Sequence, residues 1–278
     1  MDLGLKDAHV VLVGASRGIG RAAARKFAAD GAKLALIARN LKGLEKTAAQ
    51  CREAGSPEVL CFAADMVSSE QIDAAFAAIG AAWGSINVLI NNAANSVGTH
   101  GAFEKFTDEA TYTEAYNRIA LGYVRTTRAA LPWLKAAAWG RIVNVSTTST
   151  ATASPMLHVY NMTKAALVSM SYANAKEFAG LGIMVNVLSP GSIMVEGGNW
   201  GEVINSYFAK TGLDPNSPYD VLKMQNQMFG DGEGETIWTK RIGYVEEYGA
   251  AIAWLGSKAN SYMTGANVNV DGGSNFRG

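Results

Sequence analysis

The chain has 278 residues, of which 49% are hydrophobic and 17% charged, and its 24 basic and 24 acidic side chains give a formal net charge of zero. This composition excludes an intrinsically disordered chain, because disorder requires low hydrophobicity or a high net charge. The balanced charge gives no reason to expect a nucleic-acid partner or an acidic membrane surface.

The chain also lacks signals for secretion or membrane insertion. No run approaches the roughly 18 apolar residues that a membrane span needs, and residues 1–7 have neither the basic nor the apolar region of a signal peptide. Cys51 and Cys61 are too few for a disulfide framework and form no C-x-x-C pair, which favours two thiols in a reducing compartment. We therefore expect a soluble cytoplasmic protein.

Short apolar runs alternate with longer alanine-rich segments along most of the chain. The runs expected to form strands are 9–13, 33–38, 59–63, 86–90, 141–145, 183–188 and 266–270. The segments expected to form helices are 19–29, 41–54, 72–83, a long stretch over about 108–138, 159–179 and 246–255. Such alternation predicts right-handed βαβ units. We expect an α/β fold, a single doubly wound domain over 1–278 with a parallel seven-stranded sheet and helices on both faces.

Residues 192–240 break this rhythm. The apolar periodicity weakens there, and six aromatic residues are scattered among glycines and polar residues: Trp200, Tyr207, Phe208, Tyr219, Phe229 and Trp238. A connection this long inside a compact domain is usually functional. We expect an extended substrate lid, with an insertion that faces another subunit as the alternative.

A glycine-rich turn joins the first predicted strand to the first helix. It reads Gly14-Ala15-Ser16-Arg17-Gly18-Ile19-Gly20. Glycine at these spacings permits a sharp turn and a close approach of backbone N–H groups to a pyrophosphate, and the helix N-terminus adds a favourable dipole. In a strand–turn–helix context the pattern predicts a dinucleotide site.

The end of the second predicted strand indicates which dinucleotide. An NAD site usually has an acidic residue there that binds the ribose hydroxyls. The sequence Ile37-Ala38-Arg39-Asn40 has no carboxylate. Arg17 and Arg39 can instead bind a 2′-phosphate through charge-assisted hydrogen bonds. The sequence therefore favours NADP over NAD.

A second motif suggests acid–base chemistry. Tyr160 and Lys164 are spaced i and i+4 on a predicted helix, so they lie on one face. Because a nearby ammonium favours the phenolate, the pair is expected to bring the tyrosine pKa down from about 10 towards the working range. The hydroxyls of residues 146–149 follow the preceding strand, at the strand ends where α/β proteins bind ligands.

Together these motifs resemble the short-chain dehydrogenase/reductase family, and are similar to its bacterial 3-oxoacyl-carrier-protein reductase type. The matching elements are Gly14 to Gly20, Asp65, 91–94, Asn117, 144–147, Tyr160 with Lys164, 190–193, 264–265 and 271–273. The resemblance implies a Rossmann-type fold and a homotetramer.

The resemblance also implies roles for individual residues. Tyr160 would be the acid/base, and Lys164 would lower its pKa and hold the nicotinamide ribose. Asn117 would anchor a water in a proton relay. Thr147 would orient the substrate, with Ser146 as the alternative. The implied cofactor-binding residues are Gly14, Ser16, Arg17, Gly18, Ile19, Gly20, Arg39, Asp65, Met66, Asn92, Ala93, Ala94, Tyr160, Lys164, Pro190, Gly191 and Ile193.

Some positions depart from the family pattern. Val13 stands where the family usually has threonine and Ala94 where it usually has glycine, and both changes are small. Val195 replaces a threonine that often contacts the nicotinamide carboxamide. His100 and His158 lack carboxylates at ligand spacing, so we expect no metal site, although His158 lies close enough to Tyr160 in sequence to touch substrate.

These observations predict an NADP(H)-dependent oxidoreductase that interconverts an alcohol and a ketone or aldehyde. The aromatic residues of 192–240 suggest a bulky, partly apolar substrate. Two alternatives are a non-catalytic NADP-binding sensor or scaffold, and an isomerase or dehydratase on the same fold.

Overall fold

The structure is a computed structural model that describes residues 1–94, 99, 101–106, 108–153, 155–194, 202–229 and 237–274. Its centre is a parallel sheet of seven strands in the order β3-β2-β1-β4-β5-β6-β7. The strands are β1 (His9–Val13), β2 (Lys33–Ala38), β3 (Val59–Ala63), β4 (Val88–Asn91), β5 (Gly140–Val145), β6 (Ile183–Pro190) and β7 (Asn267–Val270). The doubly wound α/β fold expected from the sequence is confirmed.

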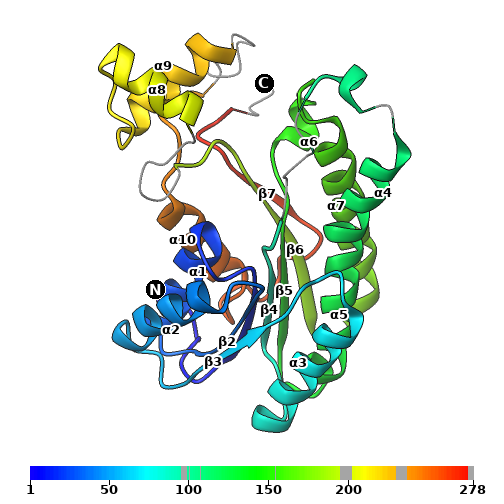
Figure 1. Cartoon of the computed structure of the whole chain (residues 1–278). Coiled ribbons are helices and arrows are strands. Elements are labelled where there is room, and N and C mark those ends of the chain that lie inside the picture. Colours follow the sequence, from blue (N-terminus) through cyan, green and yellow to red (C-terminus); the bar gives the residue numbers. More distant parts are fainter. Residues whose placement is uncertain are drawn as a thin grey trace.

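Helices cover both faces of the sheet (Figure 1). The helices in the described part of the chain are α1 (Gly18–Ala29), α2 (Leu41–Glu53), α3 (Ser69–Trp83), α4 (Glu109–Arg118), α5 (Ala120–Lys135), α6 (Ser149–Thr152), α7 (His158–Phe178), α8 (Glu202–Thr211), α9 (Pro218–Phe229) and α10 (Val245–Leu255), with 3₁₀ turns η1 (Phe103–Lys105) and η2 (Ala179–Leu181). On one face α1 packs against α2 and α10, and on the other α5 packs against α3 and α7. Along β1, Val10 and Leu12 enter the first of these cores and Val11 and Val13 the second, as strand alternation requires.

The helix expected over 108–138 is in fact two helices, and it ends earlier, at Lys135. Asp108 caps α4, and its carboxylate accepts the N–H groups of Ala110 at 2.6 Å and Thr111 at 3.2 Å. Ile119, with φ −107° and ψ −69°, separates α4 from α5. The buried side chain of Ile119 joins the core between these helices and the sheet.

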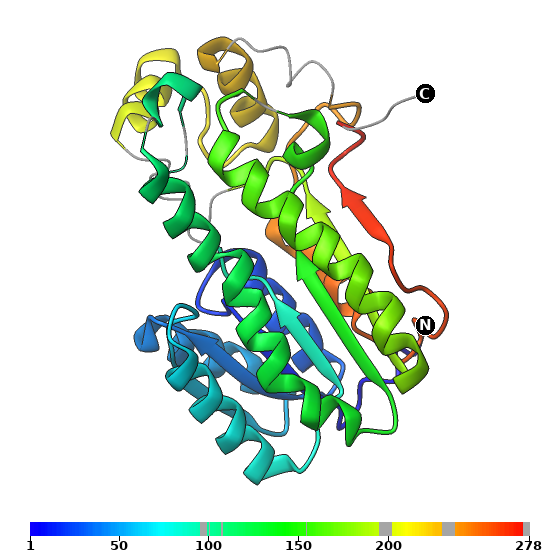
Figure 2. The same cartoon turned by 90° about the vertical axis from the view of Figure 1, so that its right-hand side faces the viewer.

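Residues 192–240 contain α8 and α9, whereas the sequence suggested irregular structure. The two helices have a hydrophobic cluster of their own, the α8–α9 cluster. Its buried residues are Met194, Phe208, Val221, Leu222, Met224, Ile237 and Ile242. Figure 2 shows both helices at the end of the molecule towards which the strand arrows point.

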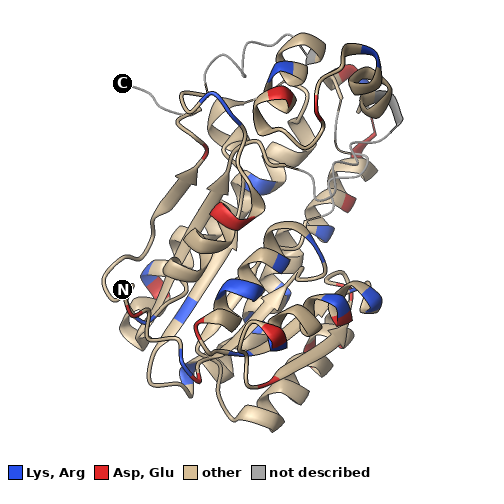
Figure 3. Cartoon of the chain, turned by 90° about the vertical axis from the view of Figure 1, so that its left-hand side faces the viewer, with Lys and Arg blue, Asp and Glu red and all other residues tan. Residues whose placement is uncertain are grey.

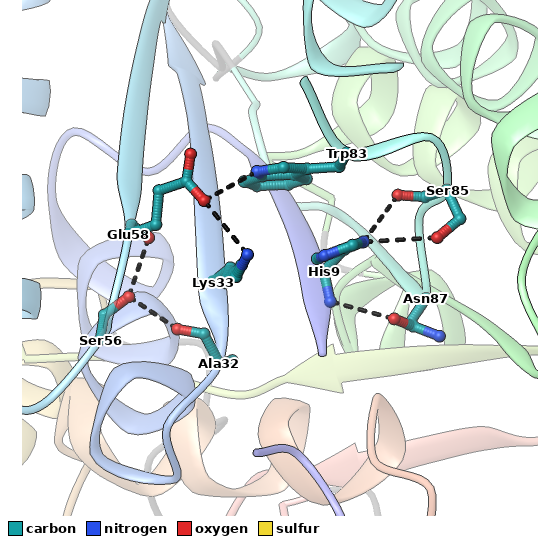
Figure 4. Close-up of polar contacts among 8 residues, drawn as sticks. All are labelled: His9, Ala32, Lys33, Ser56, Glu58, Trp83, Ser85 and Asn87. Atoms are coloured by element: carbon teal, nitrogen blue, oxygen red, sulfur yellow. Dashed lines mark hydrogen bonds and ion pairs between the residues drawn. The ribbon is translucent and has the colours of Figure 1, made fainter. Parts of the chain in front are cut away.

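A polar cluster lies at the opposite, amino-terminal ends of the strands. His9 stacks on Trp83 with 4.9 Å between ring centroids, and its Nδ1 lies 3.0 Å from the carbonyl of Ser85 (Figure 4). Trp83 donates to the Glu58 carboxylate at 3.2 Å, and the Lys33 ammonium lies 3.5 Å from the same carboxylate. This cluster ties α3 to the starts of β1 and β2.

Basic and acidic residues are interspersed along the helices seen in Figure 3, in keeping with the balanced composition. Among the described residues, no helix combines the length and apolar character needed to cross a membrane.

Candidate active site

The glycine-rich turn has the geometry that its sequence predicts. Gly14 and Gly18 have φ of +90° and +57°, which favours glycine. A Cβ on Gly14 would lie 2.5 Å from the backbone nitrogen of Ala93, and one on Gly20 would lie 2.1 Å from the carbonyl oxygen of Gly14. The turn therefore packs against residues 92–93, with the N-terminus of α1 directly behind it.

Two buried side chains that the sequence analysis missed, Arg21 and Thr47, hold the backbone of this turn in place. Arg21 donates to the hydroxyl of Thr47 at 3.0 Å and to the carbonyl of Ser16, and the Thr47 hydroxyl donates to the carbonyl of Ala15 at 2.9 Å. These bonds fix the backbone of residues 15–16. The signal available in the sequence was Arg21, which is followed by three alanines on a helix expected to pack against the sheet. A cation buried there needs hydrogen-bond acceptors.

Arg39 and Asp65 meet at the carboxyl ends of β2 and β3. The guanidinium lies 3.6 Å from the carboxylate, with 62% of the arginine side chain and 34% of the aspartate side chain exposed. Arg17, the N-cap residue of α1, is also exposed. Two of the predicted cofactor-binding residues are thus brought together, and both arginines are accessible to a ligand.

Met66 and Asn92 adjoin the same region. Met66 is buried, and its carbonyl accepts a hydrogen bond from Arg125 at 3.1 Å. The side-chain amide of Asn92 donates to the carbonyl of Gly14 at 3.0 Å. The 91–94 segment therefore contacts the glycine turn.

Lys164 is fully buried beside Tyr160 on α7. Its ammonium donates to the carbonyl of Val145 at 2.6 Å and to the hydroxyl of Tyr123 at 3.4 Å, and it lies 5.7 Å from the Tyr160 ring centroid. Among the described residues no acceptor takes its third N–H. The pair thus lies at the carboxyl end of β5.

The electrostatics of this pair differ from the expectation. Burial raises the pKa of Tyr160 to about 12 and lowers the pKa of Lys164 to about 7. In the protein alone, desolvation outweighs the attraction between phenolate and ammonium. The phenol is therefore protonated at neutral pH.

The two candidate substrate-orienting hydroxyls have different surroundings. Ser146 is buried, and its hydroxyl donates to the carbonyl of Lys164 at 3.5 Å. Thr147 is half-buried, and its hydroxyl is 3.0 Å from that of Ser149, which donates to the side-chain carbonyl of Asn161 at 2.6 Å. Thr147 therefore belongs to a hydrogen-bonded chain that reaches the first turn of α7.

Asn117 is held by Arg125 on α5. Its side-chain oxygen accepts from the guanidinium at 2.6 Å, and its backbone carbonyl accepts from the same group at 3.1 Å. In the described part of the chain the hydrogen bonds of the Lys164 ammonium go to Val145 and Tyr123, not to Asn117. The role of Asn117 as a water anchor thus stays a prediction.

The segment 190–193 borders the hydroxyl cluster. The carbonyl of Pro190 accepts from the backbone and hydroxyl of Thr148, at 3.0 and 3.2 Å. A Cβ on Gly191 would lie 2.8 Å from Asp271, and Ile193 forms an isolated bridge with Gly243. These contacts place the segment beside residues 147–148.

The remaining positions singled out in the sequence are His158, His100 and Val195. The His158 ring lies edge-on to Phe103, with centroids 5.5 Å apart. His100 and Val195 lie outside the described residues. Within the described ranges no three His, Cys, Asp or Glu side chains are grouped so as to hold a metal ion.

Comparisons with known proteins agree with this geometry. The family model for short chain dehydrogenases matches residues 8–199. The chain is 30% identical to the oxidoreductase asL5 of Sarocladium schorii, over 95% of this chain and 94% of the relative. It is 27% identical to the 3-oxoacyl-[acyl-carrier-protein] reductase MabA of Mycobacterium avium, over 95% of this chain and 88% of that one.

A solved structure is similar over the whole length. The L-sorbose reductase from Gluconobacter frateurii, complexed with NADPH and L-sorbose, covers 100% of both chains with a TM-score of 0.85 and 27% identity. The matched family model spans more than half of the chain, including the glycine turn and the Tyr160–Lys164 pair. The chain therefore belongs to the short chain dehydrogenase family.

Proposed function

We propose that this protein is an NADP(H)-dependent oxidoreductase that interconverts an alcohol and a ketone or aldehyde. The observation that carries the proposal is the Tyr160–Lys164 pair at the carboxyl end of β5, with the buried ammonium anchored on the carbonyl of Val145. In the sheet, β4 alone separates β5 from β1, which leads into the glycine turn. A nucleotide on that turn can therefore extend to the catalytic pair.

The described residues fit NADP. The glycine turn leaves no room for a Cβ at Gly14 and Gly20, and it presents the N-terminus of α1 to a pyrophosphate. Arg17 and Arg39 are exposed cations for a 2′-phosphate, and Lys164 has an N–H to give to a ribose hydroxyl. The similar L-sorbose reductase is complexed with NADPH. When bound, the cofactor would supply the hydride.

The protein's own residues manage the proton. During reduction Tyr160 donates its phenolic proton to the substrate oxygen, and during oxidation the phenolate takes a proton back. A pKa of about 12 keeps the phenol protonated at neutral pH, as the donor role requires. The hydroxyl of Thr147, which donates to Ser149 while Ser149 donates to Asn161, turns to hold the substrate oxygen when substrate binds. We prefer Thr147 to Ser146 because Ser146 is buried and bonded to the backbone of α7.

The proposed substrate class rests on α8 and α9, which lie at the carboxyl end of the sheet (Figure 2). We propose that α8 and α9 form a lid over the carboxyl ends of the strands, and that a bulky, partly apolar alcohol or ketone binds beneath it.

Four large hydrophobic side chains of α4, α5 and α7 are exposed, which supports a homotetramer built on these helices: Tyr116, Val124, Met162 and Tyr172. A cytoplasmic location is part of the same proposal.

The test is a panel of ketones, aldehydes and alcohols, L-sorbose among them, followed by NADPH absorbance. Replacement of Tyr160 by Phe should lower kcat by about 100-fold or more while NADPH still binds. Tyr262→Phe, at a fully exposed tyrosine, is the matched control and should keep wild-type kcat.

Three results would contradict the proposal. A Tyr160→Phe variant with near wild-type kcat would overturn the assigned mechanism. NADPH binding without turnover of any panel compound would favour a sensor or scaffold. Substrate conversion without net NADPH consumption would favour an isomerase or dehydratase.

A further inference from the structure

We propose that Tyr123 is a positioning residue for Lys164, whose buried ammonium it holds in place and keeps charged through its phenolic oxygen. The inference rests on the proposed function, because it assigns Lys164 a part in the reaction. It adds a side chain of α5 to a site otherwise built from β5 and α7.

Tyr123 occupies the core-facing side of α5. Its neighbours on that side include Ala120, Thr127, Ala130 and Leu134, all buried, and Tyr123 itself is fully buried. A phenol placed there without hydrogen-bond partners would be costly, whereas phenylalanine would fill nearly the same volume without that cost. The buried hydroxyl of Tyr123 therefore requires hydrogen-bond partners within the core.

That environment is a triangle of three polar groups. The Tyr123 hydroxyl donates to the carbonyl of Val145 at 3.2 Å and accepts from the Lys164 ammonium at 3.4 Å, and the ammonium donates to the same carbonyl at 2.6 Å. The ammonium also lies 5.2 Å from the centroid of the Tyr123 ring. Lys164 is thus fixed from two sides, and its remaining N–H is left for a ligand.

The protonation states make the hydroxyl an acceptor for the cation. Burial, and then the neighbouring Tyr160, raise the pKa of Tyr123 well above its ordinary value, so the phenol stays neutral. The described titratable groups around the ammonium are Tyr123 from α5 and Tyr160 from α7, and β5 contributes only the Val145 carbonyl. No described carboxylate makes an ion pair with Lys164. The neutral hydroxyl and that carbonyl therefore carry the stabilisation of its charge.

The primary experiment needs no turnover. The pKa of Lys164 is measured from its side-chain ¹³Cε resonance in the cofactor-free protein, assigned with Lys164→Met. Loss of a hydrogen bond to a charged group is expected to lower this pKa by about one unit in Tyr123→Phe. Tyr248→Phe is the matched control, because Tyr248 is equally buried and donates to a backbone carbonyl, that of Ser192 at 2.9 Å. It should leave the Lys164 pKa unchanged.

A second variant separates the hydroxyl from the ring. Tyr123→Leu removes both, so it should lower the Lys164 pKa at least as much as Tyr123→Phe. An unchanged Lys164 pKa in folded Tyr123→Phe overturns the proposal, as does a shift seen only in Tyr123→Leu, which would assign the effect to the ring.

A kinetic readout follows for any substrate that the enzyme accepts. The limb of the kcat–pH profile that reports Lys164 should move to lower pH by the same amount in Tyr123→Phe, with KM within about twofold of wild type. An unmoved limb counts against the proposal. Failure of the proposed function is recognised separately, because wild-type protein would then convert no panel compound with net use of NADPH or NADP, whatever the NMR titration shows.

Discussion

The side-chain amide of Asn91 on β4 donates to the side-chain oxygen of Asn144 on β5 at 2.9 Å, and both residues are fully buried. The hydroxyl of Thr126 on α5 donates to Asn91 at 2.7 Å, and Asn144 donates to Ser171 on α7 at 2.9 Å. This chain of side chains links α5 to α7 along the face of the sheet that both helices cover. It joins the two helices that carry Tyr123 and Lys164.

Replacing Asn144 by Ala should therefore destabilise the protein strongly. The change leaves the amide of Asn91 without its best acceptor and removes the donor to Ser171, at about 1–3 kcal/mol for each buried unsatisfied group. We expect a loss of about 2–4 kcal/mol in the free energy of unfolding, measured with urea. Asn216→Ala, at an exposed asparagine, should stay within about 0.5 kcal/mol of wild type. Equal midpoints for the two variants would contradict the structural role of the chain.

Gly20→Ala tests the close packing of the glycine turn. A Cβ there would lie 2.1 Å from a backbone carbonyl oxygen, so the turn must shift. A shift that costs about 1–3 kcal/mol would weaken NADPH binding by about 5- to 150-fold, as measured by calorimetry. Gly180→Ala is the control, since nothing lies within 4 Å of its Cβ position and its φ is negative. Wild-type affinity in Gly20→Ala would mean that the nucleotide does not bind at this turn.

Arg39→Ala tests the choice between cofactors. The ion pair with Asp65 is exposed, so its loss should change stability by less than about 1 kcal/mol. Loss of a charge-assisted bond to the 2′-phosphate should weaken NADPH binding by about 10- to 100-fold and leave NADH binding unchanged. Arg128→Ala removes a comparable exposed pair, with Asp73 at 3.1 Å, and should affect neither cofactor. Parallel losses for NADPH and NADH in Arg39→Ala would refute the phosphate role.

The His9 cluster predicts a pH dependence of stability. Burial lowers the pKa of His9 below its ordinary value of 6.5, so the folded state binds a proton less readily than the unfolded state. Stability from this group is complete above pH 6.5 and is lost as the pH falls through the folded-state pKa. His9→Phe, which can keep the stack on Trp83, should lose less stability between pH 7.5 and pH 5 in urea unfolding experiments. A wild-type loss no larger than that of the variant would show that His9 titrates normally.

Much of the fold was predictable because its strands carry a strong local signal. The apolar runs of β1, β2 and β3 have the same bounds in the sequence and in the structure. β1 and β2 are buried inside the sheet and β3 is its half-buried edge strand, and for all three the length and hydrophobicity of the run were sufficient evidence. The glycine turn was equally local, since its function depends on backbone conformation.

Other features depend on contacts between distant segments and could not be predicted. The helices α8 and α9 have 10 and 12 residues and share one small hydrophobic cluster with Met194, Ile237 and Ile242, and the glycines around them obscured their apolar pattern. Tyr123 meets Lys164 across 41 positions of sequence. The contact depends on the packing of α5 against α7. The sequence indicated only that a tyrosine hydroxyl would lie on the buried side of a helix.

The separate α8–α9 cluster has an evolutionary consequence. Its buried side chains lie outside the two cores that pack against the sheet. Substitutions in this cluster leave the sheet's own packing unchanged, whereas the nucleotide turn and the Tyr160–Lys164 pair are built on the sheet and its flanking helices. Under the proposed function, substrate preference can therefore change through substitutions in this cluster while the chemistry built on the sheet is inherited intact.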